Sequence, residues 1–192
     1  MFKVVFNLQG KGMAMRKINF FVAIILFLIS FQAVQAGTFY LHDHPSYWWY
    51  VVQEPAFSAV IPSTAENYNQ RSIFGMEILE MTFANGTIVM DVIYQPGKDV
   101  EAVRASLEER YRPLVTNVAL LADREITTSN NLKAYFYAYE ATGSQGKRVM
   151  LRSVFFQKDE HILYLTMFCD SDQYQGDVRE YWLRAVNGLE WN

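Results

Sequence analysis

The sequence contains a single cysteine, Cys169, among its 192 residues. One thiol excludes a disulfide within the chain. Cys169 ends the apolar segment 163–169, whose composition is typical of a β-strand, and we therefore expect the thiol to be buried. His161 stands eight residues earlier on the same expected strand, which separates the two side chains by about 26 Å at roughly 3.3 Å per residue. A cysteine–histidine nucleophile pair between them is excluded on this geometry.

Motifs that identify common enzyme classes are also missing. The chain contains no G-x-S-x-G sequence, no H-E-x-x-H sequence and no Walker loop. The acidic segment 170–176 begins like a calcium-binding loop, but Tyr174 and Tyr181 stand where an EF-hand requires an oxygen ligand and a glutamate. We therefore expect a protein that is not an enzyme and has no cofactor.

Acidic residues are missing from residues 1–36, which carry only basic charges, at Lys3, Lys11, Arg16 and Lys17. The apolar run 18–31 follows these charges, and the small residues Val34 and Ala36 come after it. This order predicts a secretory signal peptide that is cleaved before Gly37. The apolar run is shorter than the ~20 residues that a membrane-spanning helix needs, so we expect no membrane span after cleavage.

The mature chain, 37–192, is expected to be a single domain that is exported to the periplasm or the cell exterior. Loss of the first 36 residues leaves 156, enough for one domain with a substantial core. Loss of their four basic charges takes the formal net charge from −3 to −7. An acidic domain without a basic stripe is a poor partner for nucleic acid and for anionic membrane surfaces.

The clearest local pattern is a β-hairpin. Asn85 and Gly86 separate two runs of alternating apolar residues, which favours a tight turn. In the resulting register the apolar residues share one face as cross-strand pairs: Leu79 with Val92, Met81 with Met90, and Phe83 with Ile88. The other face places Glu80 opposite Asp91, and we expect such a like-charge pair only on a face exposed to water.

The remaining segments alternate between strands and helices. Helical spacing of apolar residues follows Asp99, an expected N-cap, and stops at Pro113. A second amphipathic helix is expected from Ser171, as its cap, to Asn187. Residues 63–72 are polar and are expected to form a loop or a short helix. Strands are expected at 47–52, 56–61, 124–128, 132–140, 148–156 and 161–169, the last four as an antiparallel meander.

Two amphipathic helices must bury their apolar faces, and an antiparallel sheet is the partner that the sequence offers. The sequence therefore predicts an α+β fold. In this fold an antiparallel sheet of about six strands has helices packed on it as a layered sandwich.

Four segments resemble a known family: F-S-A-V-I-P at 57–62, D-V-E-A-V-R-A-S-L-E-E-R-Y at 99–111, L-K-A-Y-F-Y-A-Y at 132–139, and H-I-L-Y-L-T-M-F-C at 161–169. Their order, over nearly the whole mature chain, resembles PsbP, the extrinsic photosystem II protein, and the periplasmic DcrB-type proteins. The resemblance implies a PsbP-like layered sandwich and a non-enzymatic envelope protein that binds a partner. It carries over no functional residue, because it consists of an order of elements and not of a motif.

Two histidines near the mature start form a candidate metal site. His42 and His44 are two residues apart, so both imidazoles point to one side of an extended chain, with Asp43 between them. A structural zinc site needs four ligands, and a third would have to come from His161 or the amine of Gly37. We expect no stoichiometric metal here, and a metal-binding envelope protein is the alternative function.

Aromatic residues supply the candidates for partner binding. Trp48 and Trp49 are adjacent in an expected strand, so one faces the core, while the other either anchors a partner or is covered. Tyr135, Tyr137 and Tyr139 share one sheet face, opposite Ala134, Phe136 and Ala138. This tyrosine ladder either presents a binding surface or is covered by a helix.

The combined sequence evidence favours an exported, non-catalytic module of the PsbP-like type that binds another envelope protein. A small-ligand-binding domain is a further alternative. The absence of a nucleophile–base pair and the richness in aromatic residues, including 12 tyrosines, support the binding module. The oligomeric state and the identity of the partner stay open.

Overall fold

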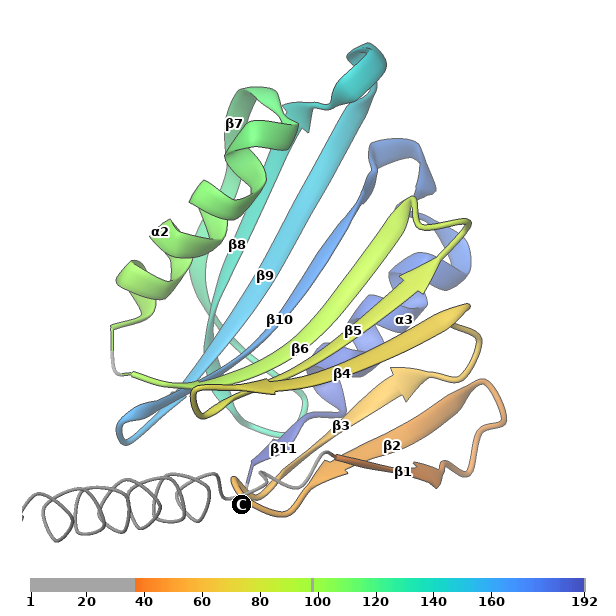
Figure 1. The fold of residues 1–192 in the computed structure, drawn as a ribbon, viewed down its shortest axis with the longest axis vertical. Helices are drawn as coiled ribbons and strands as arrows, with labels where there is room; N and C mark the ends of the chain where they lie inside the picture. Colours follow the sequence, from red (N-terminus) through yellow and green to blue (C-terminus); the bar gives the residue numbers. More distant parts are fainter. Residues whose placement is uncertain (1–36, 98, 192) are drawn as a thin grey trace, which may run out of the picture. The chain divides into compact units, whose positions relative to one another are not determined.

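The computed structural model describes residues 37–97 and 99–191, which lie within one compact unit. The expected signal peptide, 1–36, lies outside the described residues. The largest element is a seven-stranded antiparallel sheet (Figure 1). In spatial order its strands are β4 (Asn67–Ile73), β5 (Met76–Phe83), β6 (Ile88–Pro96), β10 (His161–Asp170), β9 (Arg148–Lys158), β8 (Lys133–Thr142) and β7 (Thr116–Thr127).

A second, smaller antiparallel sheet and two α-helices complete the α+β fold. The small sheet contains, in spatial order, β1 (Thr38–Leu41), β2 (Tyr47–Val52), β3 (Phe57–Pro62) and β11 (Glu190–Trp191). The helices are α2 (Val100–Tyr111) and α3 (Gly176–Asn187), and short 3₁₀ turns lie at η1 (Arg112–Leu114), η2 (Ser144–Gly146) and η3 (Ser171–Gln173). The α+β prediction is confirmed, but the single sheet of about six strands is wrong, because seven and four strands form two sheets.

β4 is a strand in the segment for which the sequence predicts a loop or a short helix. Its side chains, N-Y-N-Q-R-S-I, lack the apolar alternation that marks a strand. Pairing with β5 runs along its whole length, from Asn67 opposite Thr82 to Ile73 opposite Met76. β4 lies at one edge of the large sheet, where its side chains are partly or fully exposed, and pairing with β5 makes it a strand.

The hairpin and the order of the meander strands are as predicted, but the first meander strand, β7, begins at Thr116, eight residues before the expected start at Arg124. β5 and β6 pair in the expected register, with Leu79 opposite Val92 and Phe83 opposite Ile88. The four strands from β7 to β10 pair with their chain neighbours. β10 then pairs with β6, which joins hairpin and meander into one sheet.

Helix α2 covers one face of the large sheet. The Asp99 carboxylate accepts a hydrogen bond from the Ala102 N–H at 3.0 Å, which confirms the expected N-cap. Regular helix ends at Tyr111, two residues before Pro113. The buried side of the helix contacts sheet residues in one cluster: Val100, Val103, Leu107 and Tyr111 with Ile93, Tyr137, Tyr139, Leu151, Phe155, Ile162 and Tyr164.

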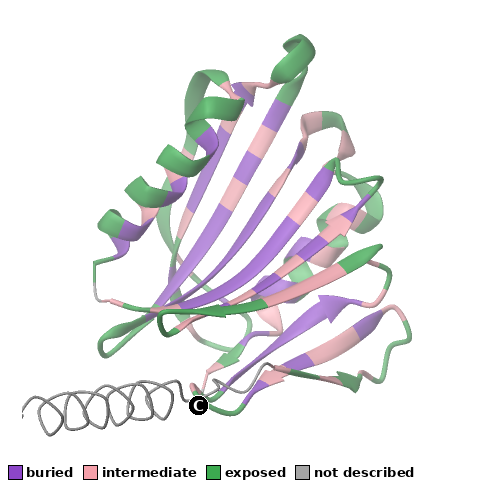
Figure 2. Cartoon of the chain, in the orientation of Figure 1, coloured by how far each residue is buried: buried purple, intermediate pink, exposed green. Residues whose placement is uncertain are grey.

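Helix α3 and the small sheet cover the opposite face, so the inner strands of the large sheet are buried on both sides, and Figure 2 shows their purple bands. Trp182, Ala185 and Val186 of α3 join the main core with residues of β2, β3, β5, β6 and β10. α3 begins at Gly176, so the prediction of Ser171 as its N-cap is wrong. Ser171 is instead the first residue of η3, which has no capping hydrogen bond from a side chain. Within the described residues, no helix has the length and apolarity to cross a membrane.

Coverage of both faces corrects one prediction from the hairpin. The face that carries Glu80 and Asp91 was expected to be exposed to water, yet Asp91 is fully buried. α2 lies over this face and places the Arg110 guanidinium 3.7 Å from the Glu80 carboxylate and 3.8 Å from that of Asp91. A positive charge from the helix therefore makes the like-charge pair tolerable away from bulk water.

The single thiol is buried, as predicted. Cys169 is 1% exposed on β10, and burial raises the pKa of the thiol to about 11. We expect the native protein to react with a thiol reagent at pH 8 at least about 100-fold more slowly than the unfolded chain, because the thiolate is scarce and the sulfur inaccessible. Labelling followed by mass spectrometry checks this, and rapid labelling of the native protein would contradict it.

Candidate functional site

The two histidines near the mature start lie in the turn between β1 and β2. The Nδ1 atom of His42 accepts a hydrogen bond from the His44 N–H at 2.9 Å, and Nδ1 of His44 accepts one from the Ser46 N–H at 3.2 Å. Each neutral imidazole therefore carries its proton on Nε2. Neither ring then has a free lone pair for a metal, unless the hydrogen bond from the backbone N–H to its Nδ1 is lost.

Neither of the proposed third ligands lies beside this turn. The four residues of β1 separate Gly37 from His42, a span of roughly 16 Å in an extended chain. His161 stacks on Tyr94 and pairs with Pro96 and Lys158 in the large sheet. Residues 37–97 and 99–191 contain no group of three or more histidine, cysteine or acidic side chains arranged to hold a metal. The absence of a stoichiometric metal stays a prediction.

The two adjacent tryptophans point to opposite sides of β2, as expected. Trp48 packs against the main core, with its ring centroid 5.7 Å from that of Phe39 and 5.2 Å from that of Tyr68. Trp49 faces the other way, with its ring 5.3 Å from His42. Both indoles are partly exposed.

Trp49 and His42 line one wall of an open groove of about 470 Å³ beside the C-terminal end of α3. Polar side chains there already have partners within the protein. The Asn187 amide accepts from the Ser129 N–H at 3.0 Å, and Arg184 Nε donates to Glu180 at 2.9 Å. The structure thus brings two predicted residues together, but in a shallow groove whose polar groups mainly fasten the 129–130 turn to α3.

The tyrosine ladder lies under α2. Tyr137 is 2% exposed and Tyr139 is 9% exposed, whereas Tyr135, beyond the helix, is 38% exposed. The Tyr137 hydroxyl donates to Glu101 at 2.7 Å, and the Tyr139 hydroxyl donates to Glu108. Of the two alternatives for the ladder, coverage by a helix therefore holds for Tyr137 and Tyr139, and they fasten the helix to the sheet.

Arg104 of α2 completes this attachment. Its guanidinium lies 2.7 Å from Glu101 and 3.5 Å from both Glu108 and Asp123 of β7. The same group lies 4.6 Å above the ring of Tyr137. Charge pairs and a cation–π contact thus meet over one buried tyrosine. Burial, with Glu101 accepting its hydrogen bond, raises the pKa of Tyr137 and keeps its hydroxyl a donor.

A row of polar side chains crosses the whole large sheet beneath α2, and sequence reasoning missed it. Each member lies directly opposite the next on the neighbouring strand. From β4 to β7 this polar row consists of Asn69, Glu80, Asp91, Thr166, Ser153, Tyr137 and Asp123. The sequence shows only the Glu80–Asp91 step, because the Asn85-Gly86 turn sets that register. The Asp91–Thr166 step, which joins the two halves of the row, depends on pairing of β6 with β10, a strand far away in the chain.

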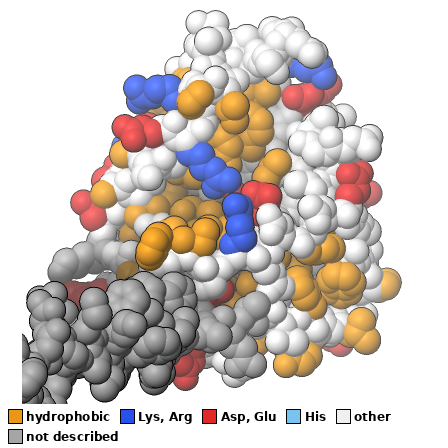
Figure 3. Space-filling view, in the orientation of Figure 1, with side chains coloured by type: hydrophobic (Ala, Val, Ile, Leu, Met, Phe, Trp, Pro, Cys, Tyr) orange, Lys and Arg blue, Asp and Glu red, His pale blue; other side chains and the backbone are white. Residues whose placement is uncertain are grey.

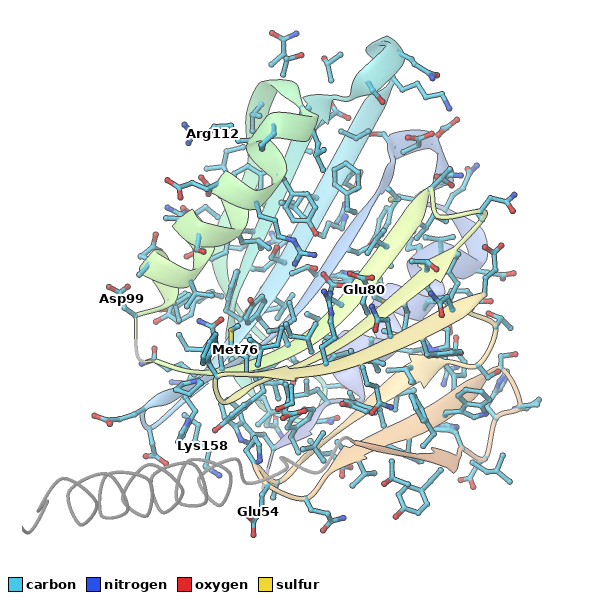
Figure 4. All side chains as sticks on the ribbon, viewed as in Figure 1. Glu54, Met76, Glu80, Asp99, Arg112 and Lys158 are labelled. Atoms are coloured by element: carbon cyan, nitrogen blue, oxygen red, sulfur yellow. The ribbon has the colours of Figure 1, made fainter. Side chains whose placement is uncertain are left out.

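Asp91 is the most deeply buried acid of the polar row. Thr166 Oγ1 donates to its Oδ2 at 3.2 Å, while Oδ1 has no hydrogen-bond partner among the described protein groups. Burial raises its pKa from the ordinary 3.8 to about 6, and the Arg110 charge opposes the rise. Glu80, the neighbour of Asp91 in the polar row, lies at the centre of the sheet face beneath α2 (Figure 4). In the space-filling view, basic and acidic side chains lie beside each other between hydrophobic areas (Figure 3).

A cavity of about 300 Å³ opens at the C-terminal end of α2, near Arg112 (Figure 4). Most of its walls are apolar, and Tyr111 stacks on Phe168 there at 5.2 Å between ring centroids. We call it the α2 cavity; its lining is Glu108, Tyr111, Arg112, Val115, Val118, Tyr139, Ala141, Val149, Leu151 and Phe168. A smaller cavity of about 200 Å³ lies on the β5–β6 side of the helix. Asp91 lines neither cavity.

Exposed apolar side chains lie at or next to residues that line the α2 cavity. Val118 is 57% exposed, and Leu120, on the same side of β7 opposite Tyr139, is 51% exposed. Leu114, between the lining residues Arg112 and Val115, is 57% exposed. We call Leu114, Val118 and Leu120 the apolar rim. β7 is the other edge of the large sheet, so the rim continues onto an edge strand that pairs on one side only.

Comparison with known proteins identifies the fold. No protein-family model and no curated protein matches the chain. The solution structure of cyanobacterial PsbP (CyanoP) from Synechocystis sp. PCC 6803 aligns with a TM-score of 0.55 and 7% sequence identity, over 77% of this chain and 93% of that one. A crystal structure of PA94, a Pseudomonas aeruginosa protein of unknown function, aligns with a TM-score of 0.40 and 14% identity, over 80% and 95% of the two chains. The predicted resemblance to the PsbP-like fold is confirmed for the fold alone.

Proposed function

We propose that this PsbP-like domain is an exported, non-catalytic module that binds another envelope protein at the α2 cavity. An apolar side chain of the partner fills the cavity, and the apolar rim packs against the surface around it. The observation that carries the proposal is the combination of a nearly apolar cavity of about 300 Å³ with exposed Leu114, Val118 and Leu120 at its mouth.

The extent of the exposed apolar surface favours a protein over a small molecule. A small ligand held inside the cavity leaves Leu114 and Leu120 of the apolar rim, 57% and 51% exposed, in water. A protein partner covers both cavity and rim, and contiguous exposed apolar surface with charged residues around it is typical of interaction sites. Glu108 and Arg112 at the cavity supply charges of both signs for orientation.

The arrangement of the acids supports a non-catalytic role. Asp91, whose pKa burial raises to about 6, has the raised pKa that a general acid or base requires. It is fully buried and lies outside both cavities beside α2. A catalytic acid must reach its substrate, and burial of Asp91 beneath the helix favours a structural role for it.

A photo-crosslinking amino acid at position 114 of the exported protein tests the proposed site. We expect one adduct of defined mass with an envelope protein, because residue 114 lies at the rim. A second substitution, Val118→Asp, is expected to reduce the adduct at least about tenfold, since it places a charge in an apolar contact. The measurement is adduct yield by mass spectrometry.

Ile73 provides the matched control, because it is 41% exposed on β4 at the opposite edge of the large sheet. A crosslinker at position 73 should not give this adduct. Ile73→Asp, with the crosslinker at position 114, should leave the adduct yield unchanged. Equal adducts from positions 73 and 114 would contradict the site. Release of a stoichiometric small molecule from the purified protein would instead favour a ligand-binding domain.

A further inference from the structure

Glu77 is a buried acid that the proposed site does not use. It is the second residue of β5, on the face covered by the small sheet, and it is 3% exposed. Ser72 donates a hydrogen bond to its carboxylate, but Oε1 has no partner among the described groups. Burial raises its pKa. A buried carboxylate with an unpaired oxygen is costly, which points to a cationic group that comes to this position.

Gly37 lies against Tyr50, the neighbour of this acid. The Gly37 N–H donates to the Tyr50 hydroxyl, and the Glu77 charge acts on the same hydroxyl. A Cβ atom built on residue 37 would lie 2.1 Å from the ring of Tyr50 and 2.7 Å from its oxygen. Tyr50 is only 1% exposed, so the ring has little room to move. Residue 37 must therefore be glycine to bring its nitrogen this close.

The start of β1 is held in place independently of this nitrogen. Phe39 contacts the rings of Trp48, Tyr50 and Tyr68 at 5.5–5.7 Å between centroids. β1 also pairs with β2, with Thr38 opposite Val51. The nitrogen of residue 37 is thus positioned beside Tyr50 by its neighbours.

We propose that cleavage before Gly37 creates an α-ammonium group that binds inside the protein between the Tyr50 hydroxyl and the Glu77 carboxylate. The inference depends on the predicted signal cleavage and is independent of the α2 cavity. An export protease hydrolyses the Ala36–Gly37 bond with one water molecule. The water oxygen goes to the carboxylate of Ala36, and the Gly37 nitrogen, taking protons from water and solvent, becomes –NH₃⁺.

The new group has the chemistry that this position lacks. An ammonium offers three N–H donors and a positive charge, whereas the uncleaved amide offers one N–H and no charge. One donor keeps the bond to Tyr50, and another pairs with the free Oε1 of Glu77. A close, charge-assisted hydrogen bond to a carboxylate is stronger than a neutral one. Processing therefore completes the core, and the precursor cannot form this pair.

The exported protein tests the proposal through the reactivity of its α-amine. Intact mass first establishes the cleavage site. Acylation of the amine at pH 7, measured on the N-terminal peptide, should then be at least about tenfold slower than acylation of the same peptide after proteolytic release, because the paired ammonium holds its proton. Glu77→Gln should restore ordinary reactivity, whereas Glu80→Gln, on the opposite face of β5, should leave the protection unchanged.

Three results would overturn the proposal. They are a cut at another residue, an α-amine of the wild-type protein as reactive as the free peptide, and protection that survives Glu77→Gln. If Glu77→Gln fails to fold, the wild-type comparison still decides. Gly37→Ala provides a second variant, expected to expose the amine because its methyl group collides with Tyr50.

Discussion

Replacing Asp91 with asparagine is expected to stabilise the protein at pH 7 by up to about 3 kcal/mol. Burial raises the pKa of Asp91 from 3.8 to about 6, and a shift of roughly 2 units corresponds to about 3 kcal/mol at 1.36 kcal/mol per unit. The side chain is fully buried, so solvent screens this cost little. Asparagine keeps the shape and removes the charge. Arg110, whose side chain is 47% exposed, stays hydrated when it loses this partner.

The pH dependence follows from the sign of the shift. Between pH 3.8 and about 6 the folded protein binds more protons at Asp91 than the unfolded chain does. The contribution of Asp91 to the free energy of unfolding is therefore most favourable below pH 3.8, and it is lost as the pH rises through about 6. We expect the wild-type protein and Asp91→Asn to be equally stable near pH 3.5 and to diverge up to pH 7.

Chemical denaturation from pH 3.5 to 8 measures this divergence. Asp123→Asn is the matched control, because Asp123 belongs to the same polar row but its side chain is 52% exposed. Its effect on stability at pH 7 should stay below about 1 kcal/mol, as for exposed charge pairs. An Asp91→Asn variant that is less stable than wild type at pH 7 would show that the Arg110 pair outweighs burial.

Tyr137→Ala is expected to destabilise the protein by about 3–5 kcal/mol, the range for loss of a buried aromatic ring. Tyr137 is 2% exposed, contacts Phe155 at 5.7 Å between ring centroids, and donates to Glu101 of α2. Alanine removes the ring beneath Arg104 and the bond that fastens the helix. Urea denaturation monitored by circular dichroism gives the free energy of unfolding.

Two further variants separate the contributions. Tyr137→Phe keeps the ring and loses the hydroxyl, and should cost about 1 kcal/mol. Tyr135→Ala, on the same face but 38% exposed, should change stability by much less than Tyr137→Ala. Equal effects of Tyr135→Ala and Tyr137→Ala would mean that α2 does not cover the ladder as the structure shows. Because Tyr137 is a core residue, a loss of partner binding in Tyr137→Ala would not identify an interface.

Local physical chemistry determined much of this fold. A left-handed turn at Asn85-Gly86 and alternating apolar residues set the register from Leu79 opposite Val92 onward. Asp99 and the apolar spacing behind it defined α2, and the meander followed from four strand-like runs between turns. Burial of Cys169 followed from its apolar strand. Each of these features depends on residues close together in the chain, so the sequence predicts it directly.

Only the tertiary structure decided which element covers each face. Parity placed Tyr135, Tyr137 and Tyr139 on one side of a strand, but α2 covers two of them and leaves the third exposed. The same helix buries Asp91, which its hairpin register alone assigned to water. The α2 cavity likewise combines residues of α2, η1 and β7 to β10 that only folding brings together. Strand periodicity fixes which side chains share a face, whereas their solvation depends on contacts between distant segments.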